Sequence, residues 1–476
     1  MNRRHFIRNT SLAAAAAVVA PYILPSGRLF AQTGSQKAKY TVLMMFGGGV
    51  RHQESAGQLY LQHAQFPYTK DPDLKDLVGN IMPNLLVGEA PTDKIAYGSG
   101  ANGENPIAPI LSTPLQKQGV FFKEMHVGTA GHYHGFNALV SGNYNAKQGL
   151  RSKPLSPTIF EYVRRFMNPQ AEGTASKVWL VGNTIGNSIP YLNYSAAANY
   201  GAKFGANFFA PPVTFGSNGR RFLAAAKNYH PEEDFPMMYD MKDFLDNSFK
   251  TTGGVLESLG NTPDEKYKIK EFMKKMFGTD EETLMQYIPE DPKAGTDPEI
   301  IPVINKDVST LVVACEIMNY FEPTVIAVHL DGADTCHADF TSYLRNLHRQ
   351  DLAVGYMWNF IQNHPVLKDN TLMVVAPETG RNATPNPIRD KNNWYAYDHS
   401  DWNAYRSWAL MVGPGVPQNV VIEGGTTITN PDGSVTPTPA GDTAQIVLTV
   451  AETLGIKNEV ASEGMVVNSQ SFYDLL

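Results

Sequence analysis

The sequence predicts an α/β protein built on a doubly wound, mostly parallel sheet with helices on both faces. Short continuous apolar runs, such as the one that opens 39–55 and the run at 370–377, are typical of strands that are buried on both faces. In the C-terminal half these runs alternate with longer segments of helical spacing. Such strand–helix alternation favours a doubly wound parallel sheet.

The predicted elements divide the chain into three parts. Strand-like runs lie at 39–46, 119–127, 177–183, 323–330, 370–377 and 407–413. Helical patterns cover 157–167, 307–321, 340–364 and 442–456, and 426–439 is typical of a hairpin around an Asn-Pro-Asp-Gly turn. The stretch in between is rich in aromatic residues and glycine and has no clear period. We therefore expect a first part of the α/β domain at 39–190, an insertion or lid at 190–300, and a second part at 301–476.

Charge and cysteine content exclude two classes of protein. The formal net charge is −7, and lysine and arginine are scattered along the chain, which argues against a nucleic-acid partner because nothing would neutralise phosphates. Cys315 and Cys336 are the only two cysteines in 476 residues, so the chain is not a disulfide scaffold. The sequence leaves their pairing open.

The N-terminus indicates export. Residues 1–31 contain the pair Arg3–Arg4, then Phe6 and Ile7, then an alanine-rich run, and they resemble a twin-arginine export signal. The run is too short and too weakly apolar to anchor securely in a bilayer. We therefore expect recognition by the twin-arginine export machinery, a periplasmic or extracellular location, and no stable membrane span in the mature form. An uncleaved N-terminal anchor is the alternative.

Polar residues follow several of the strand-like runs at the point where each run ends. Thr129, His132 and His134 follow the second run, Asp334 and His337 follow the fourth, and Glu378 and Arg381 follow the fifth, with Asp398 and His399 on the next loop. In doubly wound sheets, ligands bind in the crevice beyond the carboxyl ends of the strands, so these side chains are expected to share one polar site. Histidine together with carboxylate suits zinc or manganese, whereas carboxylate alone suits calcium or magnesium. An arginine beside such a site would bind a tetrahedral oxyanion.

Each of these signals has a structural alternative when it is taken alone. His132 and His134 lie in a glycine-flanked turn and could pack against aromatic residues, Asp331 could form a turn with Gly332, and Glu378 could cap the following segment. The joint pattern is what predicts a site.

The motifs resemble those of a known superfamily. The relevant segments are "PETGR" at 377–381, "YDHSDW" at 397–402, "DGADTCHADF" at 331–340 and "GHYHGFNALVSGNY" at 131–144. With these motifs the C-terminal half resembles the alkaline phosphatase/sulfatase superfamily, and it is most similar to a twin-arginine-exported, sulfatase-like branch.

The resemblance implies a function and a set of site residues. It implies a metal-dependent hydrolase-like protein that acts on a phosphate or sulfate ester, with metal-activated water or a hydroxyl group as nucleophile. The metal would be divalent, zinc first, with calcium, magnesium and manganese as alternatives. The roles implied are metal ligands for Asp334, His337, Glu378, Asp398 and His399, catalysis for Thr129 and His132, and substrate contact for Arg381 and His134.

The chain also departs from the superfamily pattern. Gly47–Gly49 stand where active members hold a metal with an aspartate, neither cysteine lies in the Cys-x-Pro-x-Arg pattern of sulfatases, and Pro377 and Thr379 replace a serine and a histidine. These departures support a second hypothesis: a catalytically inactive scaffold that binds a glycan or a partner protein. The aromatic residues of 191–212 would then offer faces for sugar stacking.

Overall fold

The structure is a computed structural model of the whole chain. It describes residues 35–61, 77–91, 107–146, 152–186, 188–214, 242, 246, 259–278, 306–390 and 392–476. The predicted export signal at 1–31 and most of 215–305 lie outside the described residues. No helix in the described part of the chain is long and apolar enough to cross a membrane.

One mixed, mostly parallel sheet forms the centre of the molecule, as predicted. Its strands are β1 (Tyr40–Phe46), β2 (Val120–His126), β3 (Val178–Gly182), β4 (Asn207–Phe209), β5 (Val325–Leu330), β6 (Thr371–Pro377), β7 (Arg406–Val412), β8 (Val420–Ile422) and β11 (Gly441–Asp442). They lie in the order β11-β2-β7-β6-β1-β5-β3-β4, and β8 pairs with β2. Strand β1 is parallel to both of its neighbours, whereas β7 is antiparallel to β2 and β6. The reversal of β7 leaves β2 pointing in the same direction as β1, β5 and β6.

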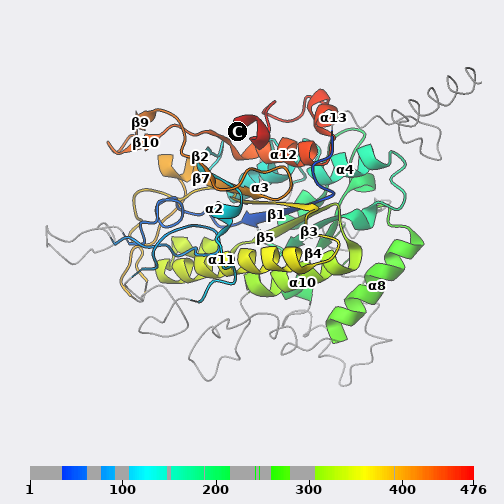
Figure 1. Cartoon of the computed structure of the whole chain (residues 1–476), viewed down its shortest axis with the longest axis horizontal. Helices are drawn as coiled ribbons and strands as arrows, with labels where there is room; N and C mark the ends of the chain where they lie inside the picture. The colour runs from blue at the N-terminus through cyan, green and yellow to red at the C-terminus, as the bar shows by residue number, and fades with distance from the viewer. Residues whose placement is uncertain are drawn as a thin grey trace, which may run out of the picture.

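Helices cover both faces of this sheet, which confirms the doubly wound arrangement (Figure 1). On one face lie α10 (Lys306–Phe321) and α11 (Phe340–Asn363), and on the other lie α3 (His132–Ser141), α4 (Ile159–Met167) and α12 (Ile446–Thr453). The other described helices are α2 (Leu115–Gln118), α5 (Pro211–Thr214), α8 (Pro263–Gly278) and α13 (Lys457–Ser462). The short strands β9 (Thr427–Thr429) and β10 (Val435–Pro437) form the predicted hairpin.

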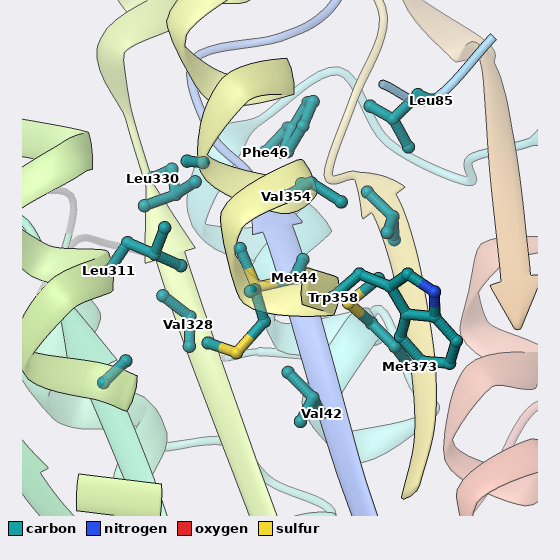
Figure 2. Packing of buried hydrophobic residues seen from close by; sticks show 14 of the residues in the cluster. Val42, Met44, Phe46, Leu85, Leu311, Val328, Leu330, Val354, Trp358 and Met373 are labelled. Atoms are coloured by element: carbon teal, nitrogen blue, oxygen red, sulfur yellow. The ribbon is translucent and has the colours of Figure 1, made fainter. Parts of the chain in front are cut away.

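The strands are apolar on both faces because both faces are covered. Along β5, Val328 and Leu330 pack in the cluster between the sheet and the helices α10 and α11. Ala327 packs in the cluster on the opposite face, which α3 covers. Figure 2 shows the first cluster, in which Leu311 of α10 and Trp358 of α11 lie over the strands. Since residues that point to either face of the sheet are buried, both alternating sets of positions in such a strand are mostly apolar. This explains the continuous apolar runs in the sequence, from which buried parallel strands are predicted.

The described part of the predicted insertion is packed into the fold. Strand β4 pairs with β3 and so extends the main sheet. The aromatic side chains of this segment belong to the core: Tyr194, Tyr200, Phe204, Phe208 and Phe209 are each 8% exposed or less. These five side chains are therefore not available as faces for sugar stacking, because other protein atoms already cover them.

Candidate functional site

The carboxyl ends of β1, β2, β5 and β6 lie at one edge of the sheet, and the reversed strand β7 begins at that edge. The 3₁₀ helix η5 (Gly332–His337) follows β5, and α3 follows β2. As a result, segments that are distant in sequence meet at this edge. The side chains that meet there are His132, Asp334, Glu378, Arg381 and His399.

Glu378 lies at the end of β6 and is fully buried. Its Oε1 atom accepts hydrogen bonds from the backbone N–H of Gly48 at 2.7 Å, from the N–H of Gly49 at 3.0 Å, and from Nδ1 of His132 at 2.7 Å. The backbone N–H of Glu378 donates to the carbonyl oxygen of Phe46 at 3.1 Å, which joins the residue to the end of β1. A buried carboxylate needs such donors, since burial without them would be costly.

The glycine loop after β1 provides these donors through its backbone. Gly48 and Gly49 have φ angles of +94° and +73°, in the region that favours glycine. A Cβ atom on Gly48 would lie 1.9 Å from the backbone nitrogen of Asp334, so only glycine allows the loop to approach η5 this closely. The loop after β1 therefore presents two backbone N–H groups to Glu378.

The ring of His132 lies between two carboxylates. Nδ1 contacts Glu378 as described, and Nε2 lies 3.2 Å from Oδ1 of Asp334. An ionised carboxylate only accepts hydrogen bonds, so both ring nitrogens must carry a proton and the ring is an imidazolium. Burial alone would lower the pKa of His132, but the hydrogen bonds and charges of Asp334 and Glu378 outweigh burial and raise the pKa to about 9.

Arg381 is fully buried, and its side chain contacts several of the groups that form the site. Its guanidinium donates to the carbonyl oxygens of Gly48 and Tyr397 and to Oδ1 of Asp334, the last at 2.9 Å. Burial would raise the pKa of Asp334, but the hydrogen bond and charge of His132 and the charge of Arg381 lower it to about 2. In this arrangement Arg381 holds the glycine loop and Asp334 in place, and its predicted contact with substrate stays a prediction.

His399 lies beside His132 on the loop before β7. The two ring centroids are 4.3 Å apart. Nδ1 of His399 lies 2.7 Å from the carbonyl oxygen of Ala130, which can only accept, so Nδ1 carries the proton and Nε2 keeps a lone pair. Burial, followed by the positive charges of His132 and Arg381, lowers the pKa of His399. The edge therefore holds a cationic and a neutral histidine side by side.

The other predicted site residues do not join this network. His337 is exposed, and Asp398 is exposed and accepts from Nδ2 of Asn386 at 3.1 Å. The ring of His134 lies 5.8 Å from that of Tyr133, and the hydroxyl of Thr129 accepts from the N–H of Gly131 at 3.0 Å. The roles assigned to these four residues stay predictions.

One histidine of this region is not among the predicted site residues. His329 lies on β5 and is fully buried, and among the described residues neither of its ring nitrogens has a hydrogen-bond partner. Its ring centroid is 4.2 Å from that of Phe136 on α3, and burial lowers its pKa to about 3. A single histidine within the otherwise apolar run 323–330 was the available signal.

The predicted metal-ligand roles of the residues at this edge stay predictions. Oε1 of Glu378 accepts three N–H groups and Asp334 faces two cationic side chains, whereas Oε2 of Glu378 is buried and has no hydrogen-bond partner among the described residues. In the described part of the chain, no three histidine, cysteine, aspartate or glutamate side chains are grouped so that they could hold a metal ion. As placed, the side chains form an ion-pair network of His132, Asp334, Glu378 and Arg381.

Comparisons with known proteins give a likeness in fold only. No family model matches the chain, and no curated protein matches it in sequence. Among solved structures, the chain is similar to the alkaline phosphatase from the Antarctic bacterium TAB5, with 11% identity, a TM-score of 0.40, and coverage of 88% of this chain and 98% of that chain.

Two further structures show the same degree of likeness. The lipoteichoic acid synthase LtaP from Listeria monocytogenes is 10% identical with a TM-score of 0.40, and covers 90% of this chain and 74% of that chain. A protein of the alkaline phosphatase superfamily from Vibrio parahaemolyticus is 9% identical with a TM-score of 0.35, and covers 89% of this chain and 68% of that chain. At these identities and TM-scores the likeness assigns no family, ligand or activity to this chain.

Proposed function

We propose that this protein hydrolyses an anionic ester, of phosphate or sulfate, with water as the nucleophile and His399 as the general base. One observation carries the proposal. Nδ1 of His399 is held by the carbonyl oxygen of Ala130, which leaves Nε2 as a base, and the ring lies 4.3 Å from the cationic ring of His132. Two neighbouring groups with pKa values shifted in opposite directions are the arrangement that acid–base chemistry needs.

In the proposed reaction a single proton passes through His399. Nε2 takes a proton from water as the water oxygen forms its bond to phosphorus or sulfur. The bond to the leaving ester oxygen breaks, and that oxygen receives the proton from Nε2, which gives the alcohol and the free oxyanion. General base catalysis by a positioned histidine contributes about 10²–10⁴-fold in rate.

Binding of the anionic group would involve His132 and Arg381. Both now donate to Asp334, whose side chain is 31% exposed. The charged group of a substrate would take over these donors as Asp334 moves aside. The position of the site beyond the strand ends, together with the sequence resemblance, supports an ester substrate.

The test is hydrolysis of aryl esters by the purified mature protein. 4-Nitrophenyl phosphate and 4-nitrophenyl sulfate are incubated in EDTA and, separately, with zinc or manganese. We expect turnover in EDTA that His399→Ala lowers by about 10²-fold or more. His364→Ala is the matched control, because His364 follows α11 at the opposite edge of the sheet. Turnover that His399→Ala does not reduce would reject His399 as the base.

A second candidate function is binding without turnover. The observation that favours it is that both nitrogens of His132 face carboxylates, while the hydroxyl of Thr129 accepts from the N–H of Gly131, so His132 does not activate the Thr129 hydroxyl. An inactive scaffold for a glycan or a partner protein would have this feature. Wild-type protein that retains a sulfated glycan but hydrolyses no ester under any metal condition would select this function.

We also propose that the protein is exported by the twin-arginine route to the periplasm or beyond. The support is the Arg3–Arg4 pair and the alanine-rich run that follows it. Cell fractionation of the wild type and of the double variant Arg3→Lys, Arg4→Lys tests this. Equal export of the two proteins would argue against it.

A further inference from the structure

We infer that Asn382 is a positioning residue for His399: it holds the backbone on both sides of this histidine and so sets where the ring lies. Asn382 lies on the segment that follows β6, whereas His399 lies on the loop before β7. The inference rests on the proposed function in one respect, since it takes Nε2 of His399 as the atom whose position matters for hydrolysis.

Asn382 makes hydrogen bonds to the residues that flank His399. Its backbone N–H donates to the carbonyl oxygen of Asp398, directly before His399, at 2.8 Å. Its side-chain oxygen Oδ1 accepts from the N–H of Ser400 at 2.5 Å and from the N–H of Asp401 at 2.8 Å. Its Nδ2 donates to the hydroxyl of Ser400 at 3.2 Å. One residue thus fixes the chain before and after His399.

The side chain of asparagine suits this task. Its carbonyl oxygen has two lone pairs and can accept from two neighbouring N–H groups, while its NH₂ group remains a donor. Asn382 is 9% exposed, so these bonds lie largely away from water. An apolar side chain at this position would deprive the N–H groups of Ser400 and Asp401 of their shared acceptor, and a lost partner is costly in a buried place.

Asn382 is itself held by Arg51, from the segment after β1. Nε of Arg51 donates to the carbonyl oxygen of Asn382 at 2.7 Å, and Nη2 donates to that of Ala383 at 3.1 Å. Arg51 is fully buried, forms an ion pair with Glu54, and its guanidinium lies 3.8 Å from the centroid of the Tyr397 ring. Asn382 is thereby anchored to another part of the fold, and not only to the loop that carries His399.

The placement matters because the ring of His399 depends on an acceptor in a distant segment. Nδ1 of His399 lies 2.7 Å from the carbonyl oxygen of Ala130, which follows β2. This bond selects the tautomer that leaves Nε2 as a base. Displacing the His399 backbone by about 1 Å would break the bond, and a misplacement of that size can cost about 10²-fold in rate. Asn382 and Ala130 together therefore define the position of Nε2.

The experiment compares Asn382→Ala with two other variants. Asn382→Asp keeps a side-chain oxygen for both N–H groups and should rescue the position of His399. Asn392→Ala is the matched control, because its Nδ2 donates to Oγ1 of Thr341 at 3.0 Å instead. NMR of the histidine ring nitrogens reports the tautomer, and the signals of His399 are assigned by their loss in His399→Ala. We expect a protonated Nδ1 in the wild type, Asn382→Asp and Asn392→Ala, and a mixture of tautomers in Asn382→Ala.

Hydrolysis of 4-nitrophenyl phosphate gives the second readout. Asn382→Ala should lower kcat by about 10–10²-fold and change KM by less than about 2-fold, because in the proposed reaction the anionic group is bound by His132 and Arg381 and not by His399. Asn382→Asp should recover most of this loss, and Asn392→Ala should keep kcat within about 3-fold of the wild type. A general loss of structure would instead change kcat and KM together.

Ring signals of His399 that are the same in the wild type and in Asn382→Ala would overturn the inference, and so would equal losses of kcat in Asn382→Ala and Asn392→Ala. If Asn382→Ala does not fold, Asn382→Ser is measured in its place with the same expectation, because the serine hydroxyl lies one bond closer to the backbone than Oδ1. A wild type without turnover rejects the proposed hydrolysis, and the NMR comparison then decides the inference alone.

Discussion

Nδ1 of His132 lies 2.7 Å from Oε1 of Glu378, although 246 positions separate the two residues in the chain. The contact depends on the topology of the sheet, because α3 follows β2, Glu378 follows β6, and the reversed strand β7 lies between these two strands. It also depends on Gly135, since a Cβ there would lie 2.3 Å from the carbonyl oxygen of Glu378. The first turn of α3 therefore packs directly against the end of β6. The ion pair forms only if β2, β6, β7 and α3 keep their relative positions at this edge of the sheet.

Replacing Glu378 by glutamine should destabilise the protein strongly. The amide side chain would keep an oxygen for the glycine N–H groups but would leave the His132 imidazolium without its buried counter-charge. Breaking one partner of a buried ion pair costs about 3–5 kcal/mol. Urea unfolding of wild type and variant measures this loss. Glu423→Gln is the matched control, because Glu423 is exposed and its pair with Lys123 contributes about 0–1 kcal/mol. Equal losses in the two variants would show that the charge of Glu378 has no special role.

The stability that His132 provides should depend on pH in a defined window. Its pKa is raised from 6.5 to about 9 in the folded protein by Asp334 and Glu378. A raised pKa contributes stability that is fully present below the unfolded value and is lost as pH rises through the folded value.

The difference in Tm between wild type and His132→Gln should therefore be constant below about pH 6.5 and shrink as the pH rises to about 9. Thermal unfolding of both proteins from pH 5 to pH 10 measures it. A difference that stays constant, or grows, between these two pH values would mean that His132 is not an imidazolium in the folded state.

Much of the fold could be predicted because it is encoded locally. The apolar run at 323–330 is continuous since both faces of β5 are covered, and helical spacing at 340–364 marks the core-facing side of α11. The direction of β7 could not be predicted, because the apolar run at 408–412 within it is compatible with either direction. Its reversal places the His399 loop at the carboxyl edge of the neighbouring strands.

Which residues lie at the site could be predicted better than which contacts their side chains make there. Strand-end positions located Asp334, Glu378 and His399 at one edge, because parallel strands end together. The contacts of these side chains could not be predicted because they reach across the chain: Oε1 of Glu378 accepts from backbone N–H groups of a distant loop, and Arg381 donates to backbone carbonyl oxygens. Spacing in the sequence does not encode such contacts.

Both cysteines should be unreactive in the folded protein. They are free and buried, and the sulfur of Cys315 lies 3.8 Å from that of Met357. Burial raises the pKa of Cys336 to about 12, so the thiolate that reacts is scarce at neutral pH. A thiol reagent such as Ellman's reagent should detect almost no thiol in native protein and two per chain after denaturation. If no thiol were detected after denaturation either, the cysteines would be paired in the purified protein.

Replacing Gly48 by alanine tests whether the glycine loop is what positions the site. Two effects add at this position: a φ of +94°, which is strained for alanine, and a Cβ that would lie 1.9 Å from the backbone nitrogen of Asp334. Gly433→Ala is a control for the first effect alone, because Gly433 has a φ of +83° and no atom of the described residues lies within 4 Å of the added Cβ.

Strain of this kind costs about 1–3 kcal/mol, and forcing an atom into packed structure adds about 1–3 kcal/mol. Unfolding by urea should therefore show a clearly larger loss for Gly48→Ala than for Gly433→Ala. The two variants should also differ at the site, because displacement of η5 moves Asp334 away from His132 and Arg381. NMR of the histidine ring nitrogens detects this: the imidazolium signals of His132 should persist in Gly433→Ala and shift in Gly48→Ala. Equal losses of stability with unchanged ring signals would mean that the loop yields without cost, and that the approach of Gly48 to η5 does not hold the network together.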